Sequence, residues 1–592
     1  AVVASAGAQA APLHADTESG NGVPEEARQM TARDGGAPTV TPDELRFTPG
    51  TTLRPGHPRQ VGLLTEKVEA MGPDLAKYLV TTPENPDYPM YAGATVVAAK
   101  DGVIVQLASV GRAVRYTLDG ETVVELPEAE QIDARPDTIW DLASMSKLFT
   151  ATSVAQLIER GLVDLAAPVV TYLPDFAANG KSDITVRNLL THTSGLIPDP
   201  IPSLWGGTYS TREEKVAAIL ATKPSDPPDT KYVYSDLNFL TLGLIVEKIS
   251  GQRLDEYVRQ HITAPLGMHD TMYNPPAELK PRIAAYEYEP WAKRGLVWGE
   301  VHDENSWAMD GVAGHAGVFS TAHDLAIFAQ TYLNGGRYGR VRILAEDTVR
   351  LMLHDYNGAT FPSDTHGLGW ELGLNWYMGA MSSPVTFGHT GYTGTSIVVD
   401  PLSHSFVVLL TNRVHPSRDW GSNNVSRRAM TDDLGLAVPV RPAAGRSAWF
   451  SRTDNAANTL TVPLSWPTER ARLSFQFWYD TENIFDTVTL ASSPDGTTFT
   501  ALPCSLHGGK YRWDSAGTFT GFGGRRWLTV EADLPEGTTA VRWTYEADTN
   551  SQGRGVYVDA VRVRAGHGTI FDSERRSDDA RIVAEGWAPA AT

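Results

Sequence analysis

Ser144 and Lys147 lie three residues apart at the start of an apolar run with helical periodicity, residues 141–160. On a helix, two side chains at this spacing share one face. A serine at a helix N-terminus has a free backbone N–H that can bind a developing oxyanion, and a lysine one turn later can take or hold the hydroxyl proton. This S-x-x-K arrangement is typical of serine acyl-transfer enzymes. The tetrad alone is a weak signal, because Ser and Lys at this spacing are common by chance.

The elements that must position this pair can be predicted along the chain. Residues 93–107 form two strands that turn at Asp101-Gly102, and residues 387–401 and 405–412 form paired strands. Helices are predicted at 68–79, 184–196, 322–333 and 423–434, and residues 231–251 form an extended piece that becomes an apolar helix ending at Gly251. A hairpin next to helices predicts a mixed sheet with helices packed on it.

Three other segments could carry chemistry. His192 could act as a base, although a single histidine near a helix end is more often structural. Residues 301–305, with His315 nearby, could hold a metal ion, but adjacent His, Asp and Glu side chains point in different directions, which favours a polar loop beside the site. Glycine-rich residues 311–317 lack the Lys-Ser/Thr ending of a phosphate loop, so we predict a tight loop there.

Composition narrows the class of protein. The 592 residues include 50 basic and 70 acidic side chains, net charge −20, which argues against nucleic acid or an anionic membrane surface as the main partner. Cys504 is the only cysteine, so neither an intramolecular disulfide nor a cysteine metal site can form. Residues 1–45 are predicted to be a signal remnant and disordered leader, because Ala8-Gln-Ala10 has the form of a signal-peptidase site. No stretch reaches the roughly 18 to 20 apolar residues of a membrane span, and we expect a secreted, extracellular protein.

The character of the chain changes after residue 437. We predict a linker over 438–450 and an all-β sandwich over 451–592, because short alternating strands follow one another between turn clusters. Its aromatic residues could form a ligand platform, but core packing is the favoured interpretation. Asp480 and Asp486 could bind calcium there, although solvated loop positions are favoured.

Three motifs stand in the order of a penicillin-recognising enzyme: Ser144-x-x-Lys147, Tyr234-Ser-Asp236 and His389-Thr390-Gly391. Together with the flanking runs ITVRNLLTHTSGL, YSDLNFLTLGLIVEKISG and GHTGYTGTS, they resemble the serine β-lactamase-related family: class C β-lactamases, D,D-carboxypeptidases, penicillin-binding proteins, and related esterases and D-amino-acid peptidases. The resemblance covers roughly residues 50–436. The tail is similar to jelly-roll modules that follow secreted bacterial hydrolases and peptidases.

The resemblance implies an α+β fold over residues 46–437, in which a helical subdomain lies beside an antiparallel sheet covered by helices and the active site lies between them. Ser144 would be the acylated nucleophile and Lys147 its proton partner, with Tyr234 as the second acid/base. The backbone N–H groups of Ser144 and Tyr392 would form the oxyanion hole. His389, Thr390 and Gly391 would line the site on the edge strand. Lys and Tyr have ordinary pKa values of about 10.4 and 10, so we expect mutual proximity to lower both.

Two residues depart from the family pattern. Asp236 stands where asparagine is commoner, so a side chain that could donate to a substrate carbonyl becomes a carboxylate that cannot, but that could bind Lys147. His389 stands where many members have lysine, so a fixed positive charge becomes one that fades above about pH 6.5. We therefore expect weaker recognition of β-lactams and D-Ala-D-Ala, partly offset if Arg413 or Arg418 faces the site.

These features predict a secreted serine hydrolase that forms an acyl-enzyme at Ser144. Its substrate would be a small peptide or amide, as for a D,D-carboxypeptidase, and the sandwich could bind cell-wall glycan or peptide. An esterase or acyl transferase on the same machinery is one alternative. A cell-wall binding or β-lactam-sensing protein with little turnover is an alternative of another class. The chemistry requires no cofactor and no metal.

Overall fold

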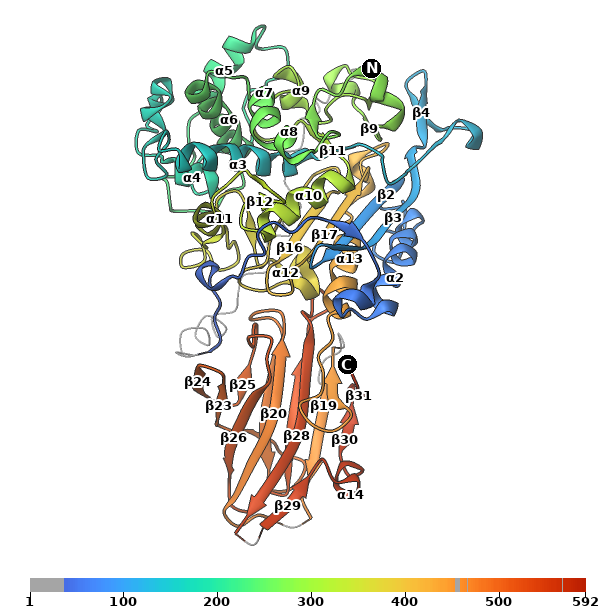
Figure 1. Cartoon of the computed structure of the whole chain (residues 1–592), viewed down its shortest axis with the longest axis vertical. Helices are drawn as coiled ribbons and strands as arrows, with labels where there is room; N and C mark the ends of the chain where they lie inside the picture. The colour runs from blue at the N-terminus through green and yellow to red at the C-terminus, as the bar shows by residue number, and fades with distance from the viewer. Residues whose placement is uncertain (1–36, 453–457, 466, 567) are drawn as a thin grey trace, which may run out of the picture.

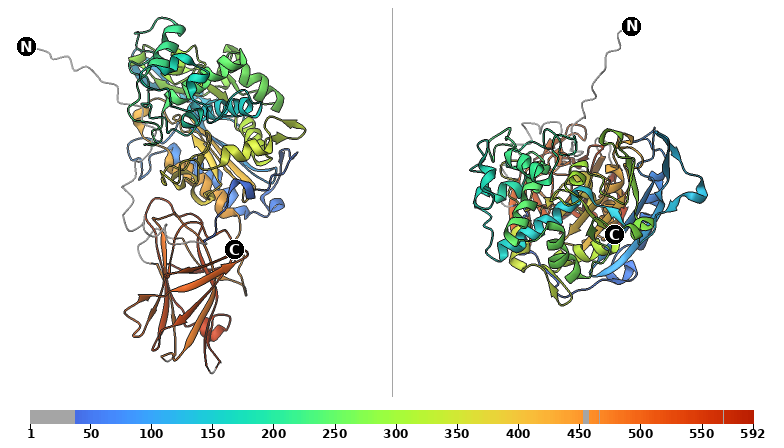
Figure 2. Two further views of the ribbon diagram at one scale, coloured as in Figure 1. Left: turned by 90° about the vertical axis from the view of Figure 1, so that its left-hand side faces the viewer. Right: turned by 90° about the horizontal axis from the view of Figure 1, so that it is seen from above.

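The computed structural model describes residues 37–592 except 453–457, 466 and 567 (Figure 1). Residues 1–36, and with them the proposed signal-peptidase site, lie outside the described residues. Helices α3 to α9 lie at one end of the molecule, the first large sheet lies in the middle, and a second, all-β part lies at the other end (Figures 1 and 2). None of the helices in the described ranges combines the length and the apolar character needed to cross a bilayer.

The central sheet has eight strands. Its antiparallel core is the β2–β3 hairpin, which turns at Asp101 and Gly102, both at positive φ (50° and 75°), as the Asp-Gly signal predicts. The strand order is β1 (Arg54–Pro55), β3 (Val103–Val114), β2 (Gly93–Lys100), β17 (Ser405–Thr411), β16 (Ser396–Asp400), β15 (Phe387–Thr390) and β14 (Glu371–Leu372), with β6 (Ile132–Asp133) on β3. The short β1 is parallel to β3.

Helices cover both faces of this sheet. Alternate residues of β2 point to opposite faces: Val97 and Ala99 belong to the core that contains α10 (Ala322–Leu333), and Val96 and Ala98 to the core that contains α2 (Thr65–Ala76) and α13 (Asn424–Ala437). Burial on both faces explains why β2, β16 and β17 are continuous apolar runs.

The helical subdomain contains α3 (Ser146–Glu159), α4 (Val186–Leu190), α5 (Arg212–Ala221), α6 (Asp236–Ser250), α7 (Leu254–Val258), α8 (Ala264–Leu266) and α9 (Glu304–Ala308). Helix α6 ends at Gly251 in the left-handed conformation, as predicted. The helix predicted over 184–196 is shorter: Thr185 caps it as expected, but it ends at Leu190 because His192 has a φ of 57°. This early end turns the His192 side chain toward the Tyr234 segment.

The remaining elements of this part are short. They are β4 (Tyr116–Asp119), β5 (Thr122–Glu125), β7 (Trp140–Asp141), β8 (Met272–Tyr273), β9 (Ala285–Tyr288), β10 (Leu296–Trp298), β11 (Val318–Ser320), β12 (Arg337–Tyr338), β13 (Val341–Arg342), α11 (Glu346–Leu353) and α12 (Asn375–Met378). Strand β11 pairs with β7 and β8, and so fixes the chain just before Ser144.

The C-terminal part consists of two antiparallel sheets that share one core. The first sheet runs β24 (Tyr511–Ser515), β23 (Cys504–Gly508), β26 (Leu528–Leu534), β20 (Ala471–Asp480), β28 (Gly555–Ala565), β18 (Ala448–Ser451) and β31 (Ala588–Ala590), with β29 (Gly568–Asp572) on β28. The second runs β22 (Thr500–Ala501), β21 (Thr487–Ser493), β27 (Ala540–Glu546), β19 (Asn458–Pro463) and β30 (Val583–Glu585), with β25 (Thr518–Phe519) on β21; α14 spans Arg576–Asp579. Phe475, Phe477 and Trp543 are buried between the sheets, so these aromatic residues are core residues.

The two parts are joined by specific contacts. Arg525 of the sandwich pairs with Asp400 of the central sheet and with Asp480, and it donates to the carbonyl of Ser382 at 2.7 Å. Residues 37–45, within the predicted leader, also bridge the parts: Leu45 is buried in the catalytic core, and the Thr39 carbonyl accepts a hydrogen bond from Tyr511 in the sandwich at 2.6 Å.

The solvated positions predicted for Asp480 and Asp486 are wrong. Asp480 is buried against Arg525, and Asp486 has no exposed surface. One carboxylate oxygen from each of Asp486, Glu482 and Asp548 lies within 4.8 Å of the others. Burial raises the pKa of Glu482 to about 8 and that of Asp486 to about 7.

Candidate active site

Ser144 lies in a single 3-10 turn, Ala143–Met145, between β7 and α3. Ala143 has a φ of 47°, a strained conformation for a residue with a side chain. Asp141 holds this turn: its Oδ1 accepts from the Ala143 N–H at 2.8 Å and its Oδ2 from the His302 N–H at 2.7 Å. The strained backbone before Ser144 is therefore held in place by the buried Asp141 side chain.

Replacing Asp141 with asparagine is expected to lower both stability and activity. One accepting oxygen becomes an NH₂ group that faces a backbone N–H, and an unmade hydrogen bond in a buried site costs about 1–3 kcal/mol. We expect a lower melting temperature, and slower labelling of Ser144 by a serine-directed phosphonate by about tenfold. The exposed Asp133→Asn variant is the control. An Asp141→Asn protein with unchanged melting temperature and labelling would contradict this role.

Lys147 connects the predicted catalytic residues. Its Nζ donates to Ser144 Oγ at 2.8 Å, lies 2.7 Å from Asp236 Oδ1 and donates to the His315 carbonyl at 3.4 Å. The same Nζ lies 4.7 Å from the centre of the Tyr234 ring. Lys147 has no exposed surface. The structure thus brings Ser144, Lys147, Tyr234 and Asp236 together around one ammonium group.

The prediction that proximity lowers the pKa values of both Lys147 and Tyr234 is wrong, because both values are raised. Burial opposes the charged form of Lys147, but Asp236 and Tyr234 outweigh it and raise the pKa of the amine. Burial also raises the pKa of Tyr234 to about 12, against the opposite effect of Lys147. The site at neutral pH therefore contains a serine hydroxyl, an ammonium group, a phenol and a carboxylate.

The His192 ring stacks on the Tyr234 ring, with ring centres 4.5 Å apart. His192 Nδ1 accepts from the Ser235 N–H at 3.1 Å and faces the Asn238 amide at 3.0 Å, so the ring proton is on Nε2. Burial keeps the pKa of His192 well below its ordinary value. His192 therefore positions the Tyr234 segment as a neutral ring.

Strand β15 carries the third motif and lies next to the two-residue edge strand β14, not at the edge itself as predicted. His389 Nδ1 donates to the Thr390 carbonyl at 2.7 Å, and burial lowers the pKa of His389 to about 3. The prediction that His389 is charged below about pH 6.5 is therefore wrong, because the folded protein removes this ring from water. The side chain of Thr390 is half-buried.

The turn after β15 is tied to the serine segment. Thr393 Oγ1 donates to the Asp141 carbonyl at 2.8 Å, and a Cβ on Gly391 would lie 2.3 Å from the Leu142 carbonyl oxygen. This close approach requires glycine at 391 and brings Tyr392 beside the Ser144 turn. The Tyr392 carbonyl accepts from Arg413 Nε at 2.8 Å.

Arg413 and Arg418, the two arginines that could have faced a substrate, bind groups of the protein itself. Arg413 donates to backbone carbonyls, including that of Gly421 at 2.7 Å. Arg418 pairs with Glu287 and Glu304, both at 2.7 Å. These guanidinium groups are engaged within the protein.

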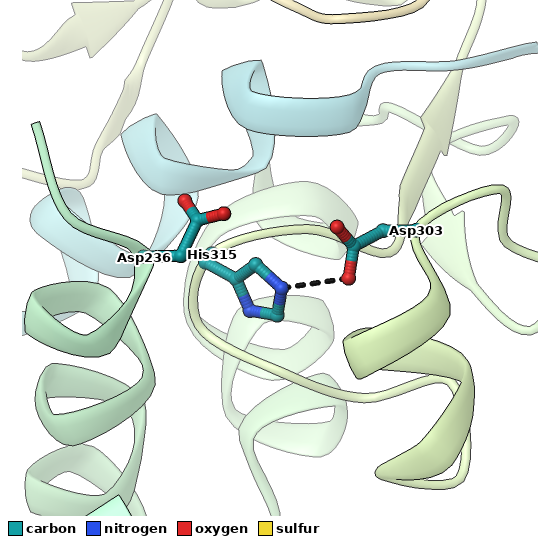
Figure 3. Close-up of side chains that lie close together, drawn as sticks. All are labelled: Asp236, Asp303 and His315. Atoms are coloured by element: carbon teal, nitrogen blue, oxygen red, sulfur yellow. Dashed lines mark hydrogen bonds and ion pairs between the residues drawn. The ribbon is translucent and has the colours of Figure 1, made fainter. Parts of the chain in front are cut away.

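The segment 301–305 contributes to the site through one residue. Asp303 Oδ1 caps α9 by accepting from the Ser306 N–H and also accepts from His315 Nε2, each at 2.7 Å. Its neighbour His302 faces Glu287 instead, at 2.8 Å. As expected, adjacent side chains point in different directions. Asp236, Asp303 and His315 nevertheless lie close together (Figure 3). One atom of each that could act as a metal ligand lies within 4.8 Å of the others.

The sequence did not single out Asp141 or Asp199 as site residues. Asp141 could have been suspected, since an aspartate two residues before Ala143 can accept its N–H in an Asx-turn. Asp199 has no local sequence signal, because its place beside Asp236 depends on a contact between segments far apart in the chain. Asp303 and His315 were recognised only as members of a possible metal-binding segment, and the sequence did not predict the hydrogen bond between them.

Comparison with known proteins identifies the family to which this chain belongs. The family model described as Beta-lactamase matches residues 90–430. A protein of Escherichia coli (strain K12) described as "Putative D-alanyl-D-alanine carboxypeptidase" is 35% identical over 353 residues, 55% of this chain and 79% of that protein. One from Salmonella agona (strain SL483) with the same description is 35% identical over 354 residues, with the same shares. The solved structure of a penicillin-binding protein homolog from Caulobacter crescentus aligns with 62% of this chain and 97% of its own, at 20% identity and a TM-score of 0.48.

The chain belongs to the β-lactamase family, with an α+β domain of that fold followed by an all-antiparallel β part, as the sequence predicts.

Proposed function

We propose that this protein is a secreted serine hydrolase that forms an acyl-enzyme at Ser144 and cleaves peptides or amides as a D,D-carboxypeptidase or penicillin-binding-protein-like peptidase does. The observation that carries the proposal is the 2.8 Å hydrogen bond from Lys147 Nζ to Ser144 Oγ, with Tyr234 beneath the same ammonium group. The family membership and the description of the Escherichia coli relative support it. The Ala8-Gln-Ala10 segment supports secretion.

The reaction follows from the positions of these groups. In the fraction of the protein in which Lys147 is an uncharged amine, Ser144 Oγ attacks the substrate carbonyl carbon and its proton moves to Lys147 Nζ, while the backbone N–H groups of Ser144 and Tyr392 stabilise the oxyanion. Tyr234 then protonates the leaving amine as the C–N bond breaks and regains a proton from Lys147. Water attacks the acyl-enzyme in the second half and gives its proton to the same pair, which returns a proton to Ser144 Oγ as the carboxylic acid leaves. Asp236 favours the charged form of Lys147 and so limits the fraction of free amine that starts the reaction.

A second candidate, an esterase or acyl transferase on the same machinery, is favoured by one observation. His389 is uncharged where many relatives have lysine, and Arg413 and Arg418 are engaged elsewhere. A substrate that ends in a free carboxylate therefore lacks a cationic partner at strand β15. An ester without a terminal carboxylate would not need one.

Incubation with a fluorescent penicillin and with a fluorescent ester-type phosphonate distinguishes these functions. We expect at least the phosphonate to label Ser144, as mapped by mass spectrometry, and the label to vanish in Ser144→Ala. Penicillin labelling of the same serine would favour the D,D-peptidase function. Labelling by the phosphonate alone would favour the esterase or acyl transferase. Labelling by neither would refute a hydrolase and favour a binding protein, for which the sandwich would contact cell-wall glycan or peptide.

A further inference from the structure

The side chains around Lys147 include three aspartates but only two cations. Lys147 pairs with Asp236 at 2.7 Å. His315 pairs with Asp303 at 2.7 Å (Figure 3). Burial opposes a charge on His315, but Asp303 raises its pKa, while His315 and the backbone N–H of Ser306 lower that of Asp303. Each of these two aspartates therefore has a cationic partner, and Asp199 is the third aspartate of the group.

Asp199 lies beside these pairs because its segment is bonded to the start of α6. The carbonyl of Pro198, the preceding residue, accepts from the Asp236 N–H at 2.8 Å, and the Ile197 carbonyl accepts from Ser235 Oγ at 2.6 Å. Within the part of the chain that the structure describes, the buried Asp199 Oδ1 has no hydrogen-bond partner. Burial, followed by the charges of Asp236 and Asp303, raises the pKa of Asp199 to about 8.

Strand β15 supplies a second unsatisfied acceptor. His389 is only 1% exposed, and because its Nδ1 donates to the Thr390 carbonyl, its Nε2 carries a lone pair. No protein group in the described ranges donates to that Nε2. The ring lies 6.3 Å from the Tyr234 ring, centre to centre. Within the described residues, Asp199 Oδ1 and His389 Nε2 are thus two buried acceptors without a donor.

We propose that the acyl donor carries a protonated amine near its scissile carbonyl, that Asp199 is the carboxylate that pairs with this amine, and that His389 Nε2 accepts another N–H of the same substrate. This inference rests on the proposed acyl-enzyme at Ser144 and specifies its substrate class. An ammonium group supplies the cation that Asp199 lacks and so favours its ionised form, and its N–H groups match acceptors that are unpaired in the described part of the chain.

Two p-nitrophenyl alkylphosphonates of equal chain length test the proposal, one ending in a free amine and the other in its N-acetyl derivative. Both phosphonylate an active serine and release p-nitrophenol, so no natural substrate has to be known. Second-order rate constants are measured at pH 8.5 for the full chain, Asp199→Asn, Asp199→Glu and the exposed control Asp175→Asn. At this pH an alkyl amine, with an ordinary pKa of about 10.4, remains protonated.

We expect the amine probe to label the wild-type protein and Asp175→Asn at least about tenfold faster than the acetylated probe. In Asp199→Asn the ratio is expected to fall to about one, chiefly through slower labelling by the amine probe, and Asp199→Glu should restore a preference. Equal rates for the two probes in the wild-type protein, or a preference that survives in Asp199→Asn, would overturn the inference while leaving the acyl-enzyme intact. Failure of both probes to label Ser144 would instead overturn the proposed function.

Discussion

Lys147→Met is expected to slow labelling of Ser144 by a serine-directed phosphonate by about a thousandfold or more. Methionine keeps the length of the buried side chain but removes the Nζ that donates to Ser144 Oγ and pairs with Asp236. The serine then loses its proton partner, and the residual rate comes from the oxyanion hole alone. The rate constant is measured by loss of activity and by mass spectrometry of the Ser144 peptide.

The control for this variant is Lys181→Met, which removes another buried lysine from the same subdomain. Lys181 Nζ donates to the carbonyls of Ala178 and Thr222 at 2.6 Å and has no carboxylate partner in the described structure. Burial accordingly lowers the pKa of Lys181 to about 8, whereas Asp236 reverses this effect at Lys147. Lys181→Met should lower stability but leave the labelling rate of folded protein within about twofold. Comparable labelling of the two variants would show that Lys147 has no catalytic role.

Asp236→Asn is expected to accelerate acylation by a penicillin at pH 7 by about tenfold. Asp236 is the largest influence that keeps Lys147 protonated, so its removal lets the pKa of the lysine fall and raises the fraction of free amine that can accept the Ser144 proton. The new amide can also donate to a substrate carbonyl, which a carboxylate cannot do. Burst kinetics with a chromogenic penicillin measure the acylation step.

The raised pKa of Lys147 also predicts how the acylation rate changes with pH. The pKa of Lys147 is raised above its ordinary value, so the acylation rate of the wild-type protein should rise with pH through the whole range from 6 to 9. In Asp236→Asn the same rise should begin at lower pH, and the difference between the two proteins should narrow as pH increases. The exposed Asp183→Asn variant should follow the wild-type profile. No gain in the acylation rate at pH 7 would count against the role assigned to Asp236.

Local sequence chemistry determined the elements that carry the site. Lys147 lies in the first turn of α3 and Ser144 in the 3-10 turn just before it, Asp101-Gly102 turns the β2–β3 hairpin, and Gly251 ends α6 where predicted. These features depend on backbone preferences and hydrophobic periodicity within a few residues, which a sequence displays directly. The family and its fold could therefore be predicted from the motifs and their order.

Only the tertiary structure decided the charges of the site. Whether Lys147 is an amine or an ammonium group depends on Asp236 facing it at 2.7 Å, and His389 loses its charge because neighbouring elements bury its ring. Asp199 lies near Lys147 because the Pro198 carbonyl accepts a hydrogen bond from the start of α6. Burial and charge proximity arise from contacts between segments distant in the chain, so no local pattern encodes the resulting pKa shifts. The sequence alone was enough to propose which residues take part in the reaction, but their protonation states depend on packing.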